Sequence, residues 1–211
     1  GQTAHALTWP LLTKPDGSKY GKTAGGETIW LSSEKMSPYR FYQAWISVDD
    51  SEVRKLLLQL TFLSPEEIDD LVTEHDQHPE NRLGQRTLAK ELTTIVHGEQ
   101  AAASAAEASD LLFDPSADIS AVSQSALEFI SGEVPSTQTQ TIQMGIIDCL
   151  VETGLCQSRK DAKRAITEGG IYVNGERVNE ADSSLTADHL LHGKYILLRR
   201  GKKLWHLLTS G

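Results

Sequence analysis

The stretch that most restricts the fold is SRKDAKRAITEGGIYVNGERV, residues 158–178. Ser158 is a residue type that caps helix N-termini, and Gly169-Gly170 marks a helix end. The apolar positions between them recur at helical spacing: Ala162, Ala165 and Ile166. Two short extended runs then flank Asn174-Gly175, the strongest short-range signal for a β-hairpin. The sequence therefore predicts a short amphipathic helix that leads directly into a tight hairpin.

Basic side chains occupy the polar side of this helix and the tip of a second predicted hairpin, YILLRRGKKLWHLL. The predicted RNA-binding residues are Arg159, Lys160, Lys163, Arg164, Asn174, Arg177, Arg199, Arg200, Lys202 and Lys203. They form one surface if the two helices of this region pack together, and such a surface meets phosphates electrostatically. Tyr172 and Trp205 alternate like core strand residues, which favours recognition of RNA shape and backbone over unstacked bases. The alternative is a solvated charged face.

The charge balance differs along the chain. Residues 1–142 hold 10 Lys and Arg against 21 Asp and Glu, whereas residues 143–211 hold 10 against 8, in a protein of net charge −9. Such a chain repels nucleic acid generally and accepts it at one place, the basic end.

The middle of the chain reads as helical. Residues 37–113 are predicted to be an all-α domain, with Ser-Pro starts at Ser37 and Ser64, a capping box from Ser64 to Glu67, and a break at Gly98. Residues 114–141 lack strong periodicity, which predicts a linker with one short helix around Ala126–Ile130.

The rest of the composition excludes other classes. Cys149 and Cys156 do not have metal-ligand spacing and are predicted to be buried thiols in a reducing compartment, with no metal site. No apolar run reaches the roughly 18 residues of a membrane span, and no signal peptide is recognised at the N-terminus. We expect a cytoplasmic protein.

The loop DGSKYGKTAGG, residues 16–26, has the composition of a phosphate-binding loop. It is not a Walker A loop, because three residues rather than four separate Gly17 from Gly21 and because Gly25-Gly26 stands where a helix should begin. Without further context, a solvated turn is the alternative.

The tail pattern resembles the α-L RNA-binding fold, which occurs in rRNA pseudouridine synthases and at the C-terminus of bacterial tyrosyl-tRNA synthetases. The segments LTWPLLTKPDGSKYGKTAGGETIWL, SPYRFYQAWI and LAKELTTIVHG, in this order, resemble the tyrosyl-tRNA synthetases, and the likeness runs essentially from end to end. A pseudouridine synthase would need its own β-rich catalytic domain, which the helical middle does not supply.

The resemblance implies an α+β multi-domain chain. Residues 1–36 would be the end of a Rossmann-like catalytic domain, residues 37–113 the all-α domain on the anticodon-arm side, and residues 142–211 a small α/β domain of the α-L type. It implies that Lys19-Tyr20-Gly21-Lys22-Thr23 is the family's variant of the class I KMSKS signature, usually K-F-G-K-[ST], with Tyr20 as a mild departure. Lys19, Gly21, Lys22 and Thr23 would then bind ATP, with Lys22 and Lys19 as catalytic residues.

The resemblance also implies partners. They are ATP with Mg²⁺, tyrosine and tRNA(Tyr), in an enzyme that is a homodimer. No H-x-G-H motif occurs in the sequence. We therefore expect the tyrosine pocket and the parallel sheet upstream of Gly1, and an isolated chain that does not form tyrosyl-adenylate. A stand-alone RNA-binding module is the alternative function.

Overall fold

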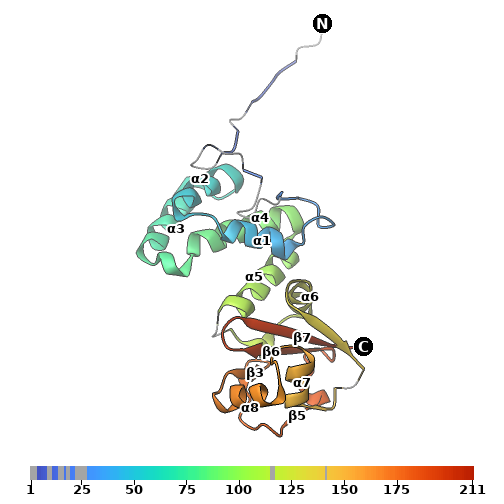
Figure 1. Cartoon of the computed structure of the whole chain (residues 1–211). Helices are drawn as coiled ribbons and strands as arrows, with labels where there is room; N and C mark the ends of the chain where they lie inside the picture. The colour runs from blue at the N-terminus through green and yellow to red at the C-terminus, as the bar shows by residue number, and fades with distance from the viewer. Residues whose placement is uncertain are drawn as a thin grey trace. The chain divides into compact units, whose positions relative to one another are not determined.

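The computed structural model describes residues 4–8, 11–13, 17, 20–21, 28–114, 117–140 and 142–211. The chain divides into a helical unit, Gly1–Ala102, and a tail unit, Ala103–Gly211 (Figure 1). This confirms the predicted order of a helical region followed by a small α/β region. No helix among these residues is long and apolar enough to cross a membrane.

The helical unit has helix starts after Ser37 and Ser64 and a break at Gly98, as the sequence predicts. Its helices are α1 (Pro38–Ile46), α2 (Asp50–Leu60), α3 (Pro65–Gln77), η1 (Pro79–Asn81), α4 (Leu83–His97) and the start of α5 (Glu99–Phe113). The Ser37 side chain caps α1 by accepting a hydrogen bond from the Arg40 amide at 3.2 Å. Ser64 and Glu67 form the predicted capping box of α3. Gly98 ends α4 with a φ of 89°, a conformation that favours glycine.

The core of the helical unit lies where α1 and α2 pack on α4. Its side chains come from all four helices: Tyr39, Phe41, Tyr42, Trp45, Val53, Leu56, Leu57, Ile68, Leu88, Ala89 and Leu92. Each large apolar side chain buried in this way contributes about 1.5–3 kcal/mol relative to an exposed one. α4 approaches α2 closely at Gly84, where an added Cβ would stand 2.5 Å from Val53 Cγ1.

The segment before α1 contains isolated bridges rather than strands in the part that the structure describes. Among its described residues only Thr13 and Thr28 are bridge positions, and no strand is formed. Single backbone hydrogen bonds connect it instead, from the Tyr20 amide to Leu12 O at 3.0 Å and from the Ile29 amide to Gly21 O at 2.8 Å. A strand forms only where a neighbouring strand satisfies its backbone donors and acceptors.

The tail unit is a five-stranded sheet with helices on both faces. Its elements are η2 (Ile119–Ala121), α6 (Gln124–Glu133), β1 (Ser136–Thr139), β2 (Met144–Gly145), α7 (Ile146–Glu152), α8 (Arg159–Thr167), β3 (Ile171–Val173), β4 (Glu176–Arg177), β5 (Ser184–Leu185), η3 (Ala187–His189), β6 (Tyr195–Arg200) and β7 (Leu204–Ser210). The strand order is β1-β7-β6-β3-β4, in which only β1 runs parallel to its neighbour. β2 and β5 pair separately.

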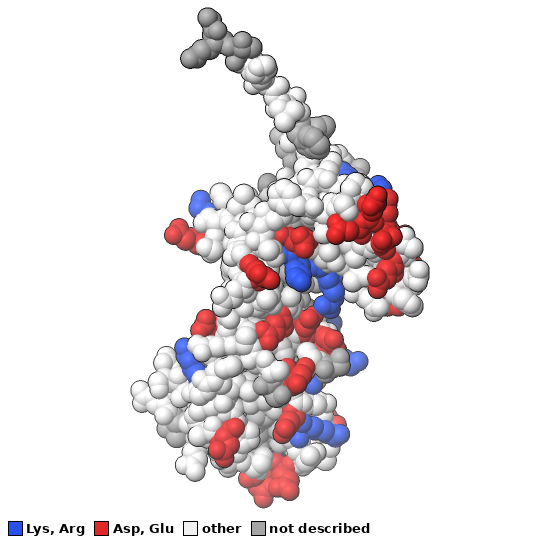
Figure 2. Space-filling model, turned by 180° about the vertical axis from the view of Figure 1, so that it is seen from behind, with Lys and Arg blue, Asp and Glu red and all other residues white. Residues whose placement is uncertain are grey.

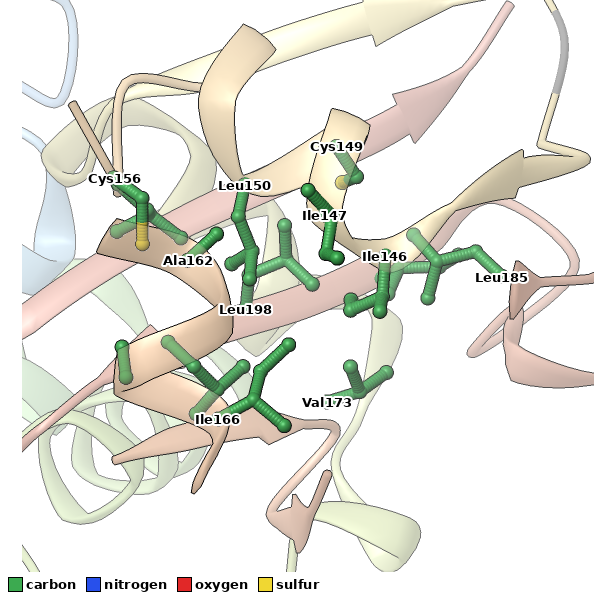
Figure 3. Close-up of a cluster of buried hydrophobic side chains, with 14 of the residues drawn as sticks. Ile146, Ile147, Cys149, Leu150, Cys156, Ala162, Ile166, Val173, Leu185 and Leu198 are labelled. Atoms are coloured by element: carbon green, nitrogen blue, oxygen red, sulfur yellow. The ribbon is translucent and has the colours of Figure 1, made fainter. Parts of the chain in front are cut away.

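The main core of the tail unit lies between the sheet and the pair α7–α8. Figure 3 shows Ile146, Leu150, Ile166 and Leu198 pointing into it. Both cysteines belong to this core, as predicted, and burial raises the pKa of the Cys149 thiol to about 12. α6 lies on the other side of the sheet (Figure 1). The four residues from Tyr195 to Leu198 are consequently all buried, as expected for a strand covered on both faces.

The segment 114–141 contains the helix predicted around Ala126–Ile130, but the rest of it differs from the expected linker. It contains η2, the full helix α6 and the strand β1, which pairs with β7 through Ser136–Thr139. β1 is an edge strand of sequence STQT, with exposed and half-buried residues in alternation. An edge strand needs little apolar surface, so its sequence carries no hydrophobic alternation from which it could be predicted.

The two predicted hairpins are present. Asn174 and Gly175 both have positive φ, 48° and 83°, which is the geometry of a type I′ turn. In the second hairpin the prediction of the tip is wrong for Arg199 and Arg200. Both belong to β6, and the turn itself begins at Gly201.

Candidate nucleic-acid interface

Helix α8 presents the predicted basic face. The Ser158 side chain caps it by accepting a hydrogen bond from the Asp161 amide at 3.2 Å. Its apolar side, Ala162, Ala165 and Ile166, is buried in the core with α7. The four basic residues of the helix are all exposed: Arg159, Lys160, Lys163 and Arg164. The spacing in the sequence thus gives the face that the structure shows.

The two arginines of this face are already paired with carboxylates. Arg159 bonds to Asp148, and Arg164 donates to Asp161 at 2.9 Å. Lys160 and Lys163 make no salt bridge to any residue that the structure describes. Because an exposed lysine without a partner loses least on meeting a phosphate, these two are the most available cations of α8.

A hollow of about 400 Å³ opens beside the first turn of α8. Arg159 and Lys163 line it, but so do the carboxylates of Asp148 and Asp182. Two acidic groups in one small hollow oppose a phosphate. The outer face of the helix is therefore the better candidate for nucleic-acid contact.

Arg200 lies on the α8 side of the sheet and is committed to the fold. Its guanidinium donates to both Asp161 oxygens, at 2.8 and 2.9 Å, and to Leu155 O at 2.7 Å. The bonds from Arg200 to Asp161, with one from the Gln157 amide, lower the pKa of Asp161 to about 2. From β6, Arg200 thus fixes the start of α8. The sequence predicts that its charge faces solvent, and this prediction is wrong.

Arg199 points to the opposite face of the sheet. It is the cross-strand partner of Tyr172 on β3 and of Trp205 on β7. Its guanidinium carbon stands 4.1 Å from the Tyr172 ring centroid and 5.2 Å from that of Trp205. Arg177 pairs with Tyr172 on the far side, so an alternating row of arginine and aromatic residues crosses four strands. Both rings are half-buried rather than in the core, which differs from the sequence expectation.

The expected single surface is therefore divided. α8 and Arg200 lie on one side of the sheet, and the Arg199 row lies on the other. Asn174 serves the turn, since its side chain donates to His189 O at 2.6 Å and accepts from the Leu197 amide at 2.9 Å. Lys202 and Lys203 are exposed in the β6–β7 turn.

The guanidinium of Arg177 packs directly on Gly169. An added Cβ at this glycine would stand 1.6 Å from Arg177 Nη2, and its φ is 72°. The positive φ favours glycine at the end of α8, whereas the exposed guanidinium of Arg177 is the flexible end of a side chain and could move away from an added Cβ.

The structure describes only part of the segment Lys19-Tyr20-Gly21-Lys22-Thr23, which we call the lysine motif. Lys19, Lys22 and Thr23 lie outside the described residues. Gly21 is described and has a φ of 123°. Lys35, which precedes α1, packs its ammonium 3.9 Å from the Trp30 ring centroid. Among the described residues, no group of three or more His, Cys, Asp or Glu could hold a metal ion.

Acidic side chains dominate the helical unit. Helix α3 alone carries Glu66, Glu67, Asp69, Asp70, Glu74 and Asp76. Figure 2 shows acidic residues gathered over the end of the unit that α3 forms. The field of this unit repels phosphates, so the tail unit is the part of the described chain suited to nucleic acid.

Comparison with known proteins agrees with this division. The family model of class I tRNA synthetases (W and Y) matches residues 2–114, and that of the tyrosine–tRNA ligase SYY-like C-terminal domain matches residues 126–208. The first match covers more than half of the sequence. The chain belongs to the class I tRNA synthetase (W and Y) family.

Its relatives carry a more specific name. The tyrosine–tRNA ligase of Geobacillus stearothermophilus is 45% identical over 205 residues, which make up 97% of this chain and 48% of that protein. The tyrosine–tRNA ligase of Opitutus terrae is 41% identical over 210 residues, 97% of this chain and 49% of that protein. The chain thus spans about half the length of these relatives. A solved tyrosyl-tRNA synthetase C-terminal domain matches 46% of this chain and 97% of its own at 34% identity, with a TM-score of 0.38.

Proposed function

We propose that this chain carries the lysine motif and the tRNA-binding region of a tyrosine–tRNA ligase, an enzyme that activates tyrosine with ATP and transfers it to tRNA(Tyr). The observation that carries the proposal is the match of two family models in succession along the chain, the second of them over the basic tail. The charge division between the two units supports it.

In this proposal α8 is the main phosphate contact of an α-L type domain. Lys160 and Lys163 meet the tRNA backbone first, and Arg159 and Arg164 join by exchanging their carboxylate partners for phosphates. Lys202 and Lys203 add contacts from the β6–β7 turn. Arg199 and Arg177, with Tyr172 and Trp205 between and beside them, offer a second basic surface. Arg200 and Asn174 are positioning residues.

The ATP part of the proposal rests on the motif. Lys19, Gly21, Lys22 and Thr23 bind the phosphates of ATP-Mg²⁺, with Lys22 and Lys19 stabilising charge that develops on pyrophosphate. The tyrosine site and the Rossmann-like sheet belong to the same enzyme, which works as a cytoplasmic homodimer. A stand-alone RNA-binding module is the second candidate, because the tail unit has its own sheet and core.

The test measures binding of the chain to a tRNA(Tyr) transcript over a range of salt concentrations. Replacing both free lysines, Lys160→Ala with Lys163→Ala, should make the slope of log K against log salt shallower by about 1–2, since each phosphate contact contributes about 0.7–0.9. The matched control is Lys90→Ala with Lys194→Ala, which removes the same charge from exposed positions outside the proposed surface.

Three results decide between the candidates. A shallower slope in the α8 variant alone, with preference for tRNA(Tyr) over other tRNAs, supports the ligase. Equal affinity for all RNA helices supports the stand-alone module. An equal change in both double variants would show that only net charge matters and that α8 is a solvated face.

A further inference from the structure

Tyr20, the residue by which this chain departs from the usual lysine motif, is packed onto the helical unit. Its ring stacks on Trp45 of α1, with centroids 6.1 Å apart and planes at 11°. Trp45 is itself held by the edge of Phe41, at 6.0 Å and 70°. Phe41 and Trp45 are both buried, so Tyr20 rests on a platform that the helical core fixes.

The hydroxyl end of Tyr20 is directed to Glu52 of α2. Burial raises the pKa of Tyr20, and the charge and hydrogen bond of the Glu52 carboxylate add to this effect. Glu52 is only 5% exposed, and its Oε2 atom has no hydrogen-bond partner among the described residues. A buried carboxylate is costly unless polar groups reach it, and the phenol of Tyr20 is one such hydrogen-bond partner of Glu52.

A second contact anchors the same segment through its backbone. Lys55, one turn after Glu52, donates to Thr13 O at 2.7 Å and stands 3.5 Å from Glu52 Oε1. The Tyr20 amide in turn bonds to Leu12 O at 3.0 Å. Two side chains of α2 and one of α1 thus hold the chain at Thr13 and at Tyr20, and Tyr20 lies inside the lysine motif.

We infer that Tyr20 is a positioning residue, whose contacts with Trp45 and Glu52 fix the lysine motif to the helical unit and so set where its lysines meet ATP phosphates. The inference rests on the proposed function for its chemical meaning, because it adds a role to that motif. Phenylalanine, the usual residue here, keeps the stacking surface but cannot donate to Glu52. The hydroxyl is therefore a contact that this chain adds.

The anchor can be measured on the chain without ATP or RNA. Hydrogen exchange of the Tyr20 and Ile29 amides reports its opening, because both bond within the segment. Tyr20→Ala should speed their exchange about tenfold, from loss of the aromatic pair and the hydrogen bond. Tyr20→Phe, which restores the stack, and Glu52→Gln should each speed it only about threefold. Leu11→Ala removes an exposed side chain of the same segment and should change nothing.

Exchange that is unaltered in Tyr20→Ala overturns the inference, while amides of α4 show that the helical unit is folded. The kinetic arm uses the complete ligase that the proposed function requires. There Tyr20→Ala should lower kcat of tyrosine-dependent pyrophosphate exchange by about tenfold to a hundredfold through misplacement of the lysines, with the KM for tyrosine within about twofold. Tyr20→Phe should recover most of that loss.

The failures of the two proposals are distinguishable. Faster exchange in Tyr20→Ala with an unchanged kcat would leave the anchor real but overturn its positioning role. An unchanged salt slope of tRNA binding in the Lys160→Ala, Lys163→Ala variant would overturn the proposed RNA surface. It would not affect the hydrogen-exchange results for Tyr20.

Discussion

Two acidic side chains hold lysine-bearing segments, one in each unit, and they are bonded differently. Asp161 of the tail unit accepts two hydrogen bonds from Arg200 and one from the Gln157 amide, so both oxygens are satisfied. Glu52 of the helical unit is more deeply buried, yet its Oε2 has no hydrogen-bond partner among the described residues, and its Oε1 is 3.5 Å from Lys55. The contacts of Asp161 should therefore be hard to break, whereas those of Glu52 should break at a small cost in free energy.

The difference suits the two proposed tasks. A surface that binds the same tRNA in every cycle gains affinity when its helix is held in place beforehand. A segment that follows ATP phosphates through a reaction must shift between steps, and a weak anchor permits that movement. The comparison teaches that the number of hydrogen-bond partners of a carboxylate, more than its burial, determines how firmly it holds the neighbouring segment.

The comparison assumes that the two units unfold independently, and the largest expected effects test this assumption. Leu150→Ala in the tail unit and Leu56→Ala in the helical unit each remove a fully buried side chain. Each should lower the free energy of unfolding of its own unit by about 2–5 kcal/mol and leave the other unit unchanged.

Urea titrations with NMR signals assigned to each unit test this expectation. Leu204→Ala, which shortens an exposed leucine of the tail unit, is the control for the chemistry of the substitution. Equal losses in both units from either core variant would mean that the chain unfolds as one body, and the two anchors could not then be compared independently.

Acid provides a sharper test of the Asp161 anchor. The folded pKa of Asp161, about 2, lies below the ordinary value of about 3.9. Its contribution to stability is therefore complete above the ordinary pKa and is lost as the pH falls from about 4 to about 2. The urea midpoint of the tail unit should fall over this window with uptake of about one proton by this site.

In Arg200→Met the pKa of the same site should move toward its ordinary value, with the bonds from the Gln157 amide and Arg164 remaining, so this part of the pH dependence should shrink. The proton count is read from the slope of unfolding free energy against pH, with the wild-type chain measured in parallel. A tail unit whose slope is the same with and without Arg200 would contradict the assigned role of the ion pair.

Local signals in the sequence predict much of this fold. Ser64 with Glu67, Gly98 and Asn174-Gly175 act within a few residues, and each stands where the structure needs it. The basic face of α8 is predictable for the same reason, since a helix places residues three and four apart on one side.

What could not be predicted depends on contacts between distant residues. Arg199 and Arg200 are neighbours in a sequence that reads as a turn, but a strand directs them to opposite faces, and which one meets Asp161 depends on packing across the sheet. The polar strand β1 exists because β7 offers it an edge. The Tyr20 platform likewise requires the fold of α1 and α2, which no motif encodes.

The smallest expected effect compares the helix caps of the two units. Ser64→Ala removes the side chain that accepts from the Glu67 amide at 3.3 Å, and the reciprocal bond from the Ser64 amide to Glu67, at 2.8 Å, remains. The helical unit should lose about 1 kcal/mol of unfolding free energy. Ser158→Ala removes the equivalent cap of α8, but Asp161 still binds Arg200 and the Gln157 amide, so the tail unit should lose only about 0.5 kcal/mol. Because those bonds keep α8 in place, the affinity of Ser158→Ala for tRNA should stay within about twofold of the unsubstituted chain. A tail unit more sensitive than the helical unit, or a clear loss of tRNA affinity in Ser158→Ala, would mean that the serine cap and not Asp161 holds the basic helix.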